Sequence, residues 1–225
     1  YIARHALPED RWLLSRFEEL KREVTQAMDE YRLHDASRAL KEFFVEDLSR
    51  WYIRLVRRRV WIEGDDPRKM VCYAILYKVL KELIVMLSPF VPFIAEELYQ
   101  RMFRPVEGGP PSVGLLHWPE PREDLIDSEL NEEMKRTREV VVAALSMRKE
   151  AGVKVRQPLS RLVLVGEGAY GVCERFGHVL AEVCNVKKVE VSKEMPPDVG
   201  YLPSRQLSFC KVFLDVPVSY THLRA

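Results

Sequence analysis

The first part of the chain has apolar residues at every third or fourth position, which is the period of an amphipathic helix. The breaks in this pattern carry helix-ending and helix-starting residues. Asp10 is a suitable cap for the first helix, Gly64 ends the second, and Pro67 follows Asp66 at the start of the third. We expect helices over about residues 10–31, 34–62, 67–87, 92–103 and 127–151. Antiparallel helices joined by short turns form a bundle, so we predict a helical-bundle domain over residues 1–151.

The pattern changes after Gly152. Short β-branched runs at 161–165, 187–191 and 211–216 predict strands, and the residues at 170–184 predict a helix between the first two strands. The sequence therefore predicts a small α+β module over residues 152–216, built as one βαβ unit with an extra strand. The fold class is mainly α. The last residues, 217–225, fit no element, and VSYTHLRA at 218–225 resembles translated sequencing-adapter sequence, so these residues enter no functional argument.

Composition narrows the classes of function. Apolar residues make up 47% of the 225 residues, and the net charge is only +1, so any binding of nucleic acid has to come from a local basic patch. The four cysteines and five histidines are scattered, which favours reduced thiols and no metal site. The chain begins without the apolar core of a signal peptide, and no apolar run is long enough to cross a membrane. We expect a cytoplasmic protein that has no contact with membranes.

The segment DLSRWYIRLVRRRVW, at residues 47–61, carries the most informative pattern. An α-helix turns by roughly 100° per residue, and this angle places two groups of side chains on opposite faces. The apolar face, expected to pack into the bundle, consists of Phe44, Leu48, Trp51, Tyr52, Leu55 and Val56. The opposite face consists of Arg50, Arg54, Arg57 and Trp61, with Phe43 beneath and Arg58 nearby. The helix is thus predicted to carry an arginine stripe that ends in an aromatic ring.

The arginine stripe has two interpretations. A charged helix face is usually just solvated, but such a face normally mixes signs to form pairs one turn apart. Between Arg50 and Arg59 there are five arginines and no acid, so a polyanion is the better explanation. The planar guanidinium suits phosphate and can stack on an unpaired base. Arg59 falls on the apolar side of the wheel, where it either emerges beyond the packed region or pairs with a buried acid.

Three further segments carry a resemblance to a known family. They are DRWLLSR at 10–16, SPFVPFIAEELYQ at 88–100 and SVGLLHWPEP at 112–121, with Ser88 where alanine is usual and Gly114 where histidine is usual. In this order they resemble the anticodon-binding helical domain of the class I aminoacyl-tRNA synthetases for isoleucine, valine and leucine. WYIR at 51–54 followed by RRR at 57–59, KVRQPL at 154–159 and NVKKVEV at 185–191 are similar to the isoleucine branch. The form DLSRWYIRLVRRR at 47–59 resembles its archaeal and eukaryotic members more closely.

This resemblance implies binding to the anticodon arm of isoleucine tRNA, as part of an ATP-dependent ligase that acts as a monomer. Contacts are expected from Arg50, Arg54, Arg57 and Arg58, from Trp61 by stacking, and from Lys154, Arg156 and Gln157 in the junction. ATP and magnesium would belong to a catalytic domain whose H-x-G-H and K-M-S-K-S motifs do not occur in this sequence. We therefore expect no catalytic residue, cofactor or metal here, and expect that domain as a partner. The corresponding region of the valine enzyme is the alternative within the family.

Two alternatives lie outside the family. Gly166, Gly168 and Gly171 form a G-x-G-x-x-G pattern between a strand and a helix, and Glu190 stands where a ribose-binding acid would, as in a Rossmann dinucleotide site. That fold needs two βαβαβ halves, and too few residues follow Gly166 to build them. A bundle that binds only other proteins is the second alternative, but it does not explain an arginine stripe without acids.

Overall fold

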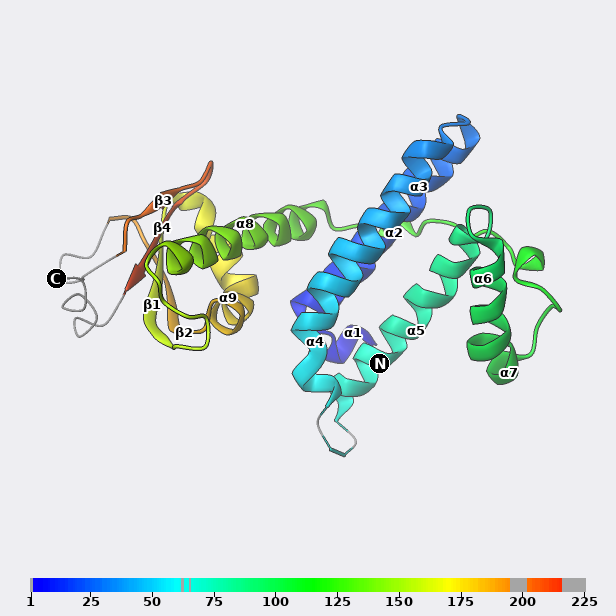
Figure 1. Cartoon of the computed structure of the whole chain (residues 1–225), viewed down its shortest axis with the longest axis horizontal. Helices are drawn as coiled ribbons and strands as arrows, with labels where there is room; N and C mark the ends of the chain where they lie inside the picture. Colours follow the sequence, from blue (N-terminus) through cyan, green and yellow to red (C-terminus); the bar gives the residue numbers. More distant parts are fainter. Residues whose placement is uncertain (1, 62, 65, 195–201, 216–225) are drawn as a thin grey trace. The chain divides into compact units, whose positions relative to one another are not determined.

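The computed structural model describes residues 2–61, 63–64, 66–194 and 202–215 (Figure 1). The chain divides into two compact units, residues 1–128 and 129–225. The helix α8 (Ser128–Glu150) therefore groups with the second unit, whereas the sequence pattern suggested a boundary at Gly152. The reason is that the buried face of α8 packs within that unit: Arg148 of α8 donates to carbonyls at the end of the next helix. The predicted fold class, a helical domain with a small α+β module, is confirmed.

The first unit is built from three long helical segments. They are α2 (Pro8–Asp29), the continuous run α3 (Leu33–Glu42), η1 (Phe43–Tyr52) and α4 (Ile53–Val60), and α5 (Pro67–Leu87). Figure 1 shows the α3–α4 run lying along α2. Shorter elements complete the unit: α1 (Ile2–His5), α6 (Pro92–Leu98), η2 (Tyr99–Phe103), α7 (Arg104–Glu107), η3 (Val113–Leu115) and η4 (Glu123–Leu125).

Most helix ends follow the local chemistry that the sequence indicated. The carboxylate of Asp66 accepts a hydrogen bond of 2.7 Å from the amide of Arg68 and caps α5. Gly64, after α4, has a φ of +99°, which only glycine adopts easily. The start of α2 differs from the prediction, because the helix begins at Pro8 and Asp10 lies in its first turn. Asp10 still satisfies a free amide, since it accepts from Leu7 at 2.9 Å.

The segment η1 is a π-helix, and it changes which residues face the core. Phe43 is fully buried, whereas Phe44 has 44% of its surface exposed. The helical wheel predicted the opposite for these two residues. The wheel assumed α-helical turns, but a π-helix bonds residue i to i+5 and turns less per residue. From Leu48 onward the wheel is correct: Leu48, Trp51, Tyr52, Leu55 and Val56 are all buried.

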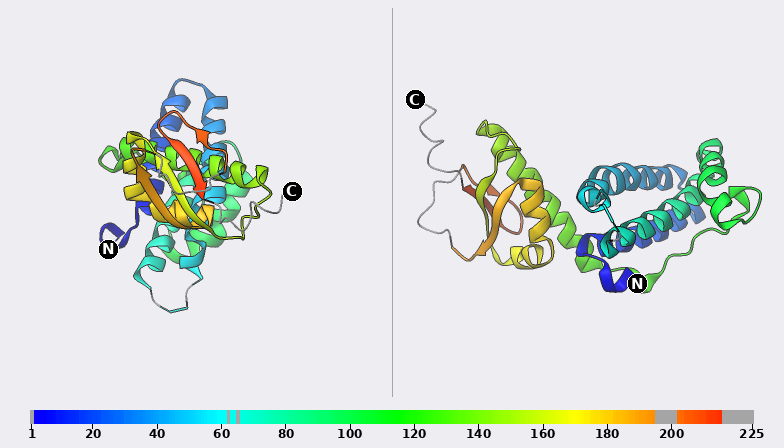
Figure 2. Two further views of the ribbon diagram at one scale, coloured as in Figure 1. Left: turned by 90° about the vertical axis from the view of Figure 1, so that its left-hand side faces the viewer. Right: turned by 90° about the horizontal axis from the view of Figure 1, so that it is seen from below.

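The second unit is an α+β module with a four-stranded sheet in the order β2-β1-β4-β3. The strands are β1 (Leu159–Val165), β2 (Val186–Ser192), β3 (Arg205–Gln206) and β4 (Lys211–Asp215). The helix α9 (Tyr170–Cys184) joins β1 to β2, which are parallel, and β4 is antiparallel to β1. This is the βαβ unit with an extra strand that the sequence predicted. Figure 2 shows α8 and α9 on the same side of this sheet. Residues 217–225 lie outside the described residues.

The glycine-rich turn between β1 and α9 is packed against the protein's own chain. Gly166 has a φ of +143°, and a Cβ there would lie 2.9 Å from the carbonyl oxygen of Phe209. A Cβ on Gly171 would lie 2.1 Å from Oε1 of Glu133 in α8. The carboxylate of Glu133 thus packs directly against Gly171 in the first turn of α9, so the glycines make room for the protein's own chain. This geometry argues against the dinucleotide alternative.

Glu190, the residue proposed for a ribose hydroxyl, is also engaged within the sheet. Its carboxylate lies 2.6 Å from Nζ of Lys188 and 3.6 Å from Nη1 of Arg161. The hydrogen bond from Lys188 holds the pKa of Glu190 below its usual value. The glycines and the acid therefore each have an internal role.

Gly166→Ala tests the packing role of the glycines, with Gly177→Ala as its matched control in the same unit. The Gly166 variant should lose about 1–3 kcal/mol of unfolding free energy, because of the backbone clash and the unfavourable φ. A Cβ on Gly177 would meet Sγ of Cys173 at an ordinary 3.6 Å, so that variant should gain about 0.4–1 kcal/mol. Urea unfolding measures both. Saturable binding of NADH to the unmodified chain would restore the dinucleotide alternative.

Candidate nucleic-acid interface

A buried ion pair fixes how α4 lies on α2. Arg59 donates from Nη1 and Nη2 to the two carboxylate oxygens of Asp10, at 2.8 and 2.9 Å. Asp10 is fully buried and also accepts from the hydroxyl of Tyr52 at 2.8 Å. A second acid, Glu9, lies 3.1 Å from Nη2 of Arg59. Of the two fates left open for Arg59 by the sequence, pairing with a buried acid is confirmed.

Two titratable side chains beside this ion pair, Tyr52 and Cys72, are held in their neutral forms. Burial, reinforced by the charge of Asp10, raises the pKa of Tyr52 far above its usual value. Burial also raises the pKa of the nearby thiol of Cys72 to about 11. Both groups keep their protons near neutral pH, which favours a structural role for Tyr52 and Cys72.

Because Arg59 points inward, the neighbouring arginines of α4 point to solvent. Arg54 and Arg57 are exposed, and among the described residues neither forms an ion pair with a carboxylate. The guanidinium carbon of Arg57 lies 5.8 Å from the ring centre of Trp61, which is 77% exposed. A hollow beside them is lined by Ser49, Ile53, Arg54, Val56, Arg57, Val60, Trp61 and Leu76. The structure therefore brings Arg54, Arg57 and Trp61 together around one apolar hollow.

Arg50 and Arg58 differ from this pair. Arg50 is exposed but lies 2.6 Å from Oε1 of Glu46, one turn before it on the same helix. The segment without acidic residues was counted from Arg50 onward and therefore left out Glu46. This carboxylate partly neutralises Arg50. Arg58 is exposed on α4 as well, but it too has an interaction partner. The uncompensated charge of the stripe is thus concentrated at Arg54 and Arg57.

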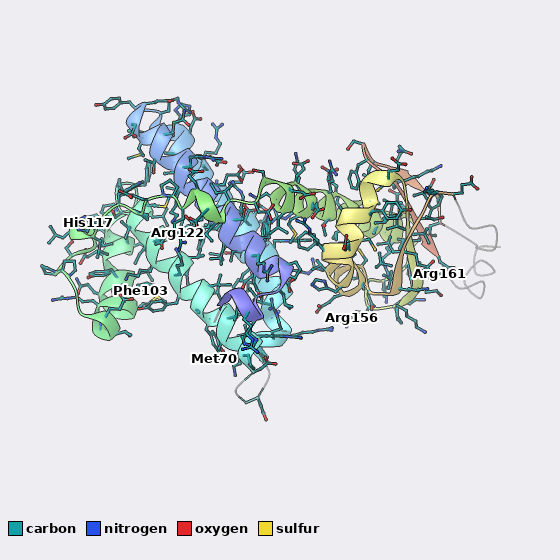
Figure 3. All side chains as sticks on the ribbon, turned by 180° about the vertical axis from the view of Figure 1, so that it is seen from behind. Met70, Phe103, His117, Arg122, Arg156 and Arg161 are labelled. Carbon is teal, nitrogen blue, oxygen red and sulfur yellow. The ribbon has the colours of Figure 1, made fainter. Side chains whose placement is uncertain are left out.

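The start of α5 adds two residues that the sequence analysis missed. Nζ of Lys69 lies 6.0 Å from the ring centre of Tyr73, and the Tyr73 hydroxyl donates to the carbonyl of Val60 at 3.4 Å. Tyr73 is 43% exposed. Figure 3 labels Met70, the residue after Lys69, near the start of α5. The signal for them was the i,i+4 spacing of a lysine and a tyrosine on an exposed helix face.

The remaining predicted contacts lie in the second unit. Lys154 and Arg156 are exposed on the loop between α8 and β1, whereas Gln157 is half-buried. Figure 3 labels Arg156 on this loop. The amide of Gln157 donates to the carbonyl of Lys154 at 3.0 Å and closes a turn. Lys154 and Arg156 thus lie on one short loop of the second unit.

The described ranges offer neither a cluster of metal ligands nor a membrane-spanning helix. Residues 2–61, 63–64, 66–194 and 202–215 contain no group of three or more histidine, cysteine, aspartate or glutamate side chains placed to hold a metal ion. Within the same ranges, each helix is too short or too polar to cross a bilayer.

Comparison with known proteins decides the family. The family model described as the anticodon-binding domain of tRNA ligase matches residues 10–163. The chain belongs to this anticodon-binding domain family. Relatives named isoleucine–tRNA ligase include that of Methanopyrus kandleri, 48% identical over 88% of this chain, and that of Methanothrix thermoacetophila, 44% identical over 91%. A third, from Thermococcus kodakarensis, is 45% identical over 82%. The matches cover 18–19% of those proteins, so the chain spans about a fifth of their length.

Within this anticodon-binding domain, the segments at 88–100 and 112–121 that carried the resemblance supply structural hydrogen bonds. Glu96 of α6 accepts from the Ser112 hydroxyl at 2.8 Å and from the amide of Val113 at 2.9 Å. The indole of Trp118 donates to the hydroxyl of Thr25 on α2 at 2.8 Å. These bonds attach the long loop after α7 to the helices. The match to archaeal relatives agrees with the branch that the sequence suggested.

Arg59→Leu tests the ion pair that orients α4. The variant leaves Asp10 and Glu9 buried without their cation, so the unfolding free energy should fall by about 3–5 kcal/mol. The control is Arg57→Gln on the exposed side of the same helix, which should change stability by less than about 0.5 kcal/mol. Urea unfolding followed by circular dichroism measures both variants. Equal stability of the two would show that the ion pair does not hold α4 in place.

Proposed function

We propose that this chain binds isoleucine tRNA through the anticodon arm, as part of an isoleucine–tRNA ligase. The observation that carries the proposal is the pair Arg54 and Arg57, exposed beside Trp61 without a carboxylate partner in the described residues. Two such guanidinium groups on one helix face repel each other unless an anion lies between them. The family match and the isoleucine–tRNA ligases among the relatives support tRNA as that anion.

The mode of contact follows from the chemistry of the hollow. Arg54 and Arg57 would bind phosphates of the anticodon loop, with Arg50 and Arg58 adding charge nearby. The exposed ring of Trp61, flanked by apolar side chains such as Ile53 and Val60, offers a surface on which an unpaired base can stack. Tyr73, with Lys69 beside it, would extend this surface. On the second unit, Lys154 and Arg156 would contact the backbone of the same tRNA.

Catalysis would belong to other parts of the ligase. The H-x-G-H and K-M-S-K-S motifs that hold ATP in class I synthetases do not occur in this sequence. We therefore infer that ATP and magnesium act elsewhere in the ligase and that this chain takes part in the reaction by holding the tRNA.

Binding assays with tRNA transcripts test this division of roles. The chain should shift isoleucine tRNA in a gel at lower concentration than it shifts valine tRNA. It should show no exchange between ATP and pyrophosphate. A preference for valine tRNA would favour the valine branch, and measurable exchange would overturn the assignment of catalysis to other parts.

The double variant Arg54→Gln, Arg57→Gln tests the arginine stripe. Each lost phosphate contact should reduce the slope of log affinity against log salt by roughly 0.7 to 0.9. The variant should therefore bind isoleucine tRNA more weakly and with less salt dependence, while its stability stays nearly unchanged because glutamine preserves helix propensity.

The matched control removes two exposed arginines elsewhere in the first unit. Arg22→Gln, Arg101→Gln lowers the net charge by the same amount, but these arginines pair with Glu123 and Glu97. The control should keep its affinity and salt slope. Equal losses in both variants would mean that overall charge, rather than the stripe, attracts the tRNA.

A further inference from the structure

Arg148, near the end of α8, is an arginine in an unusual environment. Its exposed surface is 0%, and in the described part of the chain no carboxylate pairs with it. Burial lowers the pKa of its guanidinium from the usual value. A buried cation without a counter-ion is costly unless other groups replace its hydration, so the groups that surround Arg148 indicate its role.

Main-chain carbonyl oxygens from two separate segments surround Arg148. Nη2 donates to the carbonyls of Cys184 and Asn185, at 2.7 and 2.8 Å. These carbonyls end α9, where the helix dipole carries partial negative charge. Nη1 donates to the carbonyls of Gln157 and Lys154, at 2.9 and 3.3 Å. One guanidinium therefore joins the end of a rigid helix to the loop before β1.

The same loop is held at two further points. The side-chain amide of Asn185 donates to the carbonyl of Val155 at 2.8 Å, and the amide of Val153 donates to the carbonyl of Arg148 at 2.9 Å. The loop's carbonyls are thus directed inward, while the side chains of Lys154 and Arg156 remain exposed. The loop owes its shape to these bonds and to the turn that Gln157 closes, rather than to a regular element.

We propose that Arg148 is a positioning residue for tRNA, which holds the loop at 154–157 so that Lys154 and Arg156 face the tRNA backbone. The inference rests on the proposed function of this chain. Arg148 itself, being buried, would not touch the ligand. It acts by fixing the two exposed cations before binding, so that the loop does not lose conformational freedom when the tRNA arrives.

The geometry requires arginine rather than any cation. The guanidinium is a planar fork that donates in two directions at once, whereas the ammonium of lysine is a point charge. Arg148→Lys keeps the charge but cannot bridge both carbonyl pairs, so it should release the loop while disturbing the core less than Arg148→Met does.

The experiment is a double-mutant cycle on tRNA binding. Lys154→Gln, Arg156→Gln in the unmodified chain should weaken binding and reduce the salt slope by roughly 1.4 to 1.8, for two phosphate contacts. Arg148→Lys should lose most of the same affinity, and adding the two glutamines to it should cost little more. Hydrogen exchange at the amides of Val153 and Gln157 should accelerate in Arg148→Lys. Asn185→Gly removes the hydrogen bond to Val155 and keeps the left-handed backbone at position 185. It should weaken tRNA binding and accelerate exchange at both amides, each by less than Arg148→Lys does.

A control separates positioning from stability. Gly166→Ala destabilises the same unit without touching the loop, so adding the two glutamines there should cost as much affinity as in the unmodified chain. An additive cycle with Arg148→Lys, or full affinity despite faster exchange, would overturn the inference. The inference would also be overturned if Lys154→Gln, Arg156→Gln left tRNA binding unchanged while Arg54→Gln, Arg57→Gln weakened it. The proposed function would stand in that case. Absence of tRNA binding by the unmodified chain would overturn both. If neither Arg148 variant folds, the Asn185→Gly cycle decides.

Discussion

The ion pair between Asp10 and Arg59 is the constraint on which the first unit's surface depends. A carboxylate that is completely buried needs a cation and further donors, and here Arg59, Tyr52 and the amide of Leu7 supply them. With Arg59 committed to the inside, helical geometry places Arg54 and Arg57 outside. The polar cluster in the core thus determines which arginines are free to meet an anion. Arg148 plays a comparable part in the second unit. This buried cation holds an exposed basic loop in place by hydrogen bonds to carbonyls instead of to a carboxylate.

The segments that reveal the family contain scaffold residues and candidate RNA-binding residues together. Asp10, Glu96 and Trp118 are each used for an internal hydrogen bond. A buried hydrogen-bond network tolerates few replacements, because a lost partner leaves a polar group unsatisfied. Arg54 in DLSRWYIRLVRRR and Lys154 in KVRQPL instead have exposed side chains. The scaffold therefore accounts for only part of the resemblance.

Much of the fold could be predicted from local chemistry, and the exceptions have physical causes. Pro67 with its Asp66 cap and the β-branched runs located α5 and the main strands, because those signals act over a few residues. The predicted orientations of Phe43 and Phe44 were wrong, because the apolar periodicity does not distinguish a π-helical turn from an α-helical turn. The exposure of Arg54 and Arg57 could be predicted, because helical periodicity was sufficient. The role of Arg148 could not be predicted, because several of its partners are main-chain carbonyls far along the chain. Every residue has such a carbonyl, so the sequence does not mark the ones that bind Arg148.

The π-helical segment η1 gives the chain a reserve of length that α4 lacks. A π-helix turns less per residue than an α-helix, so deleting one residue between Phe43 and Tyr52 would let the segment return to α-helical turns while the residues that follow keep nearly their present phase. The same deletion within α4, before Arg59, has no such compensation and would rotate Arg59 by about 100° about the helix axis. Arg59 would then leave Asp10. A change in length is thus tolerated or damaging according to the kind of helical turn in which it falls.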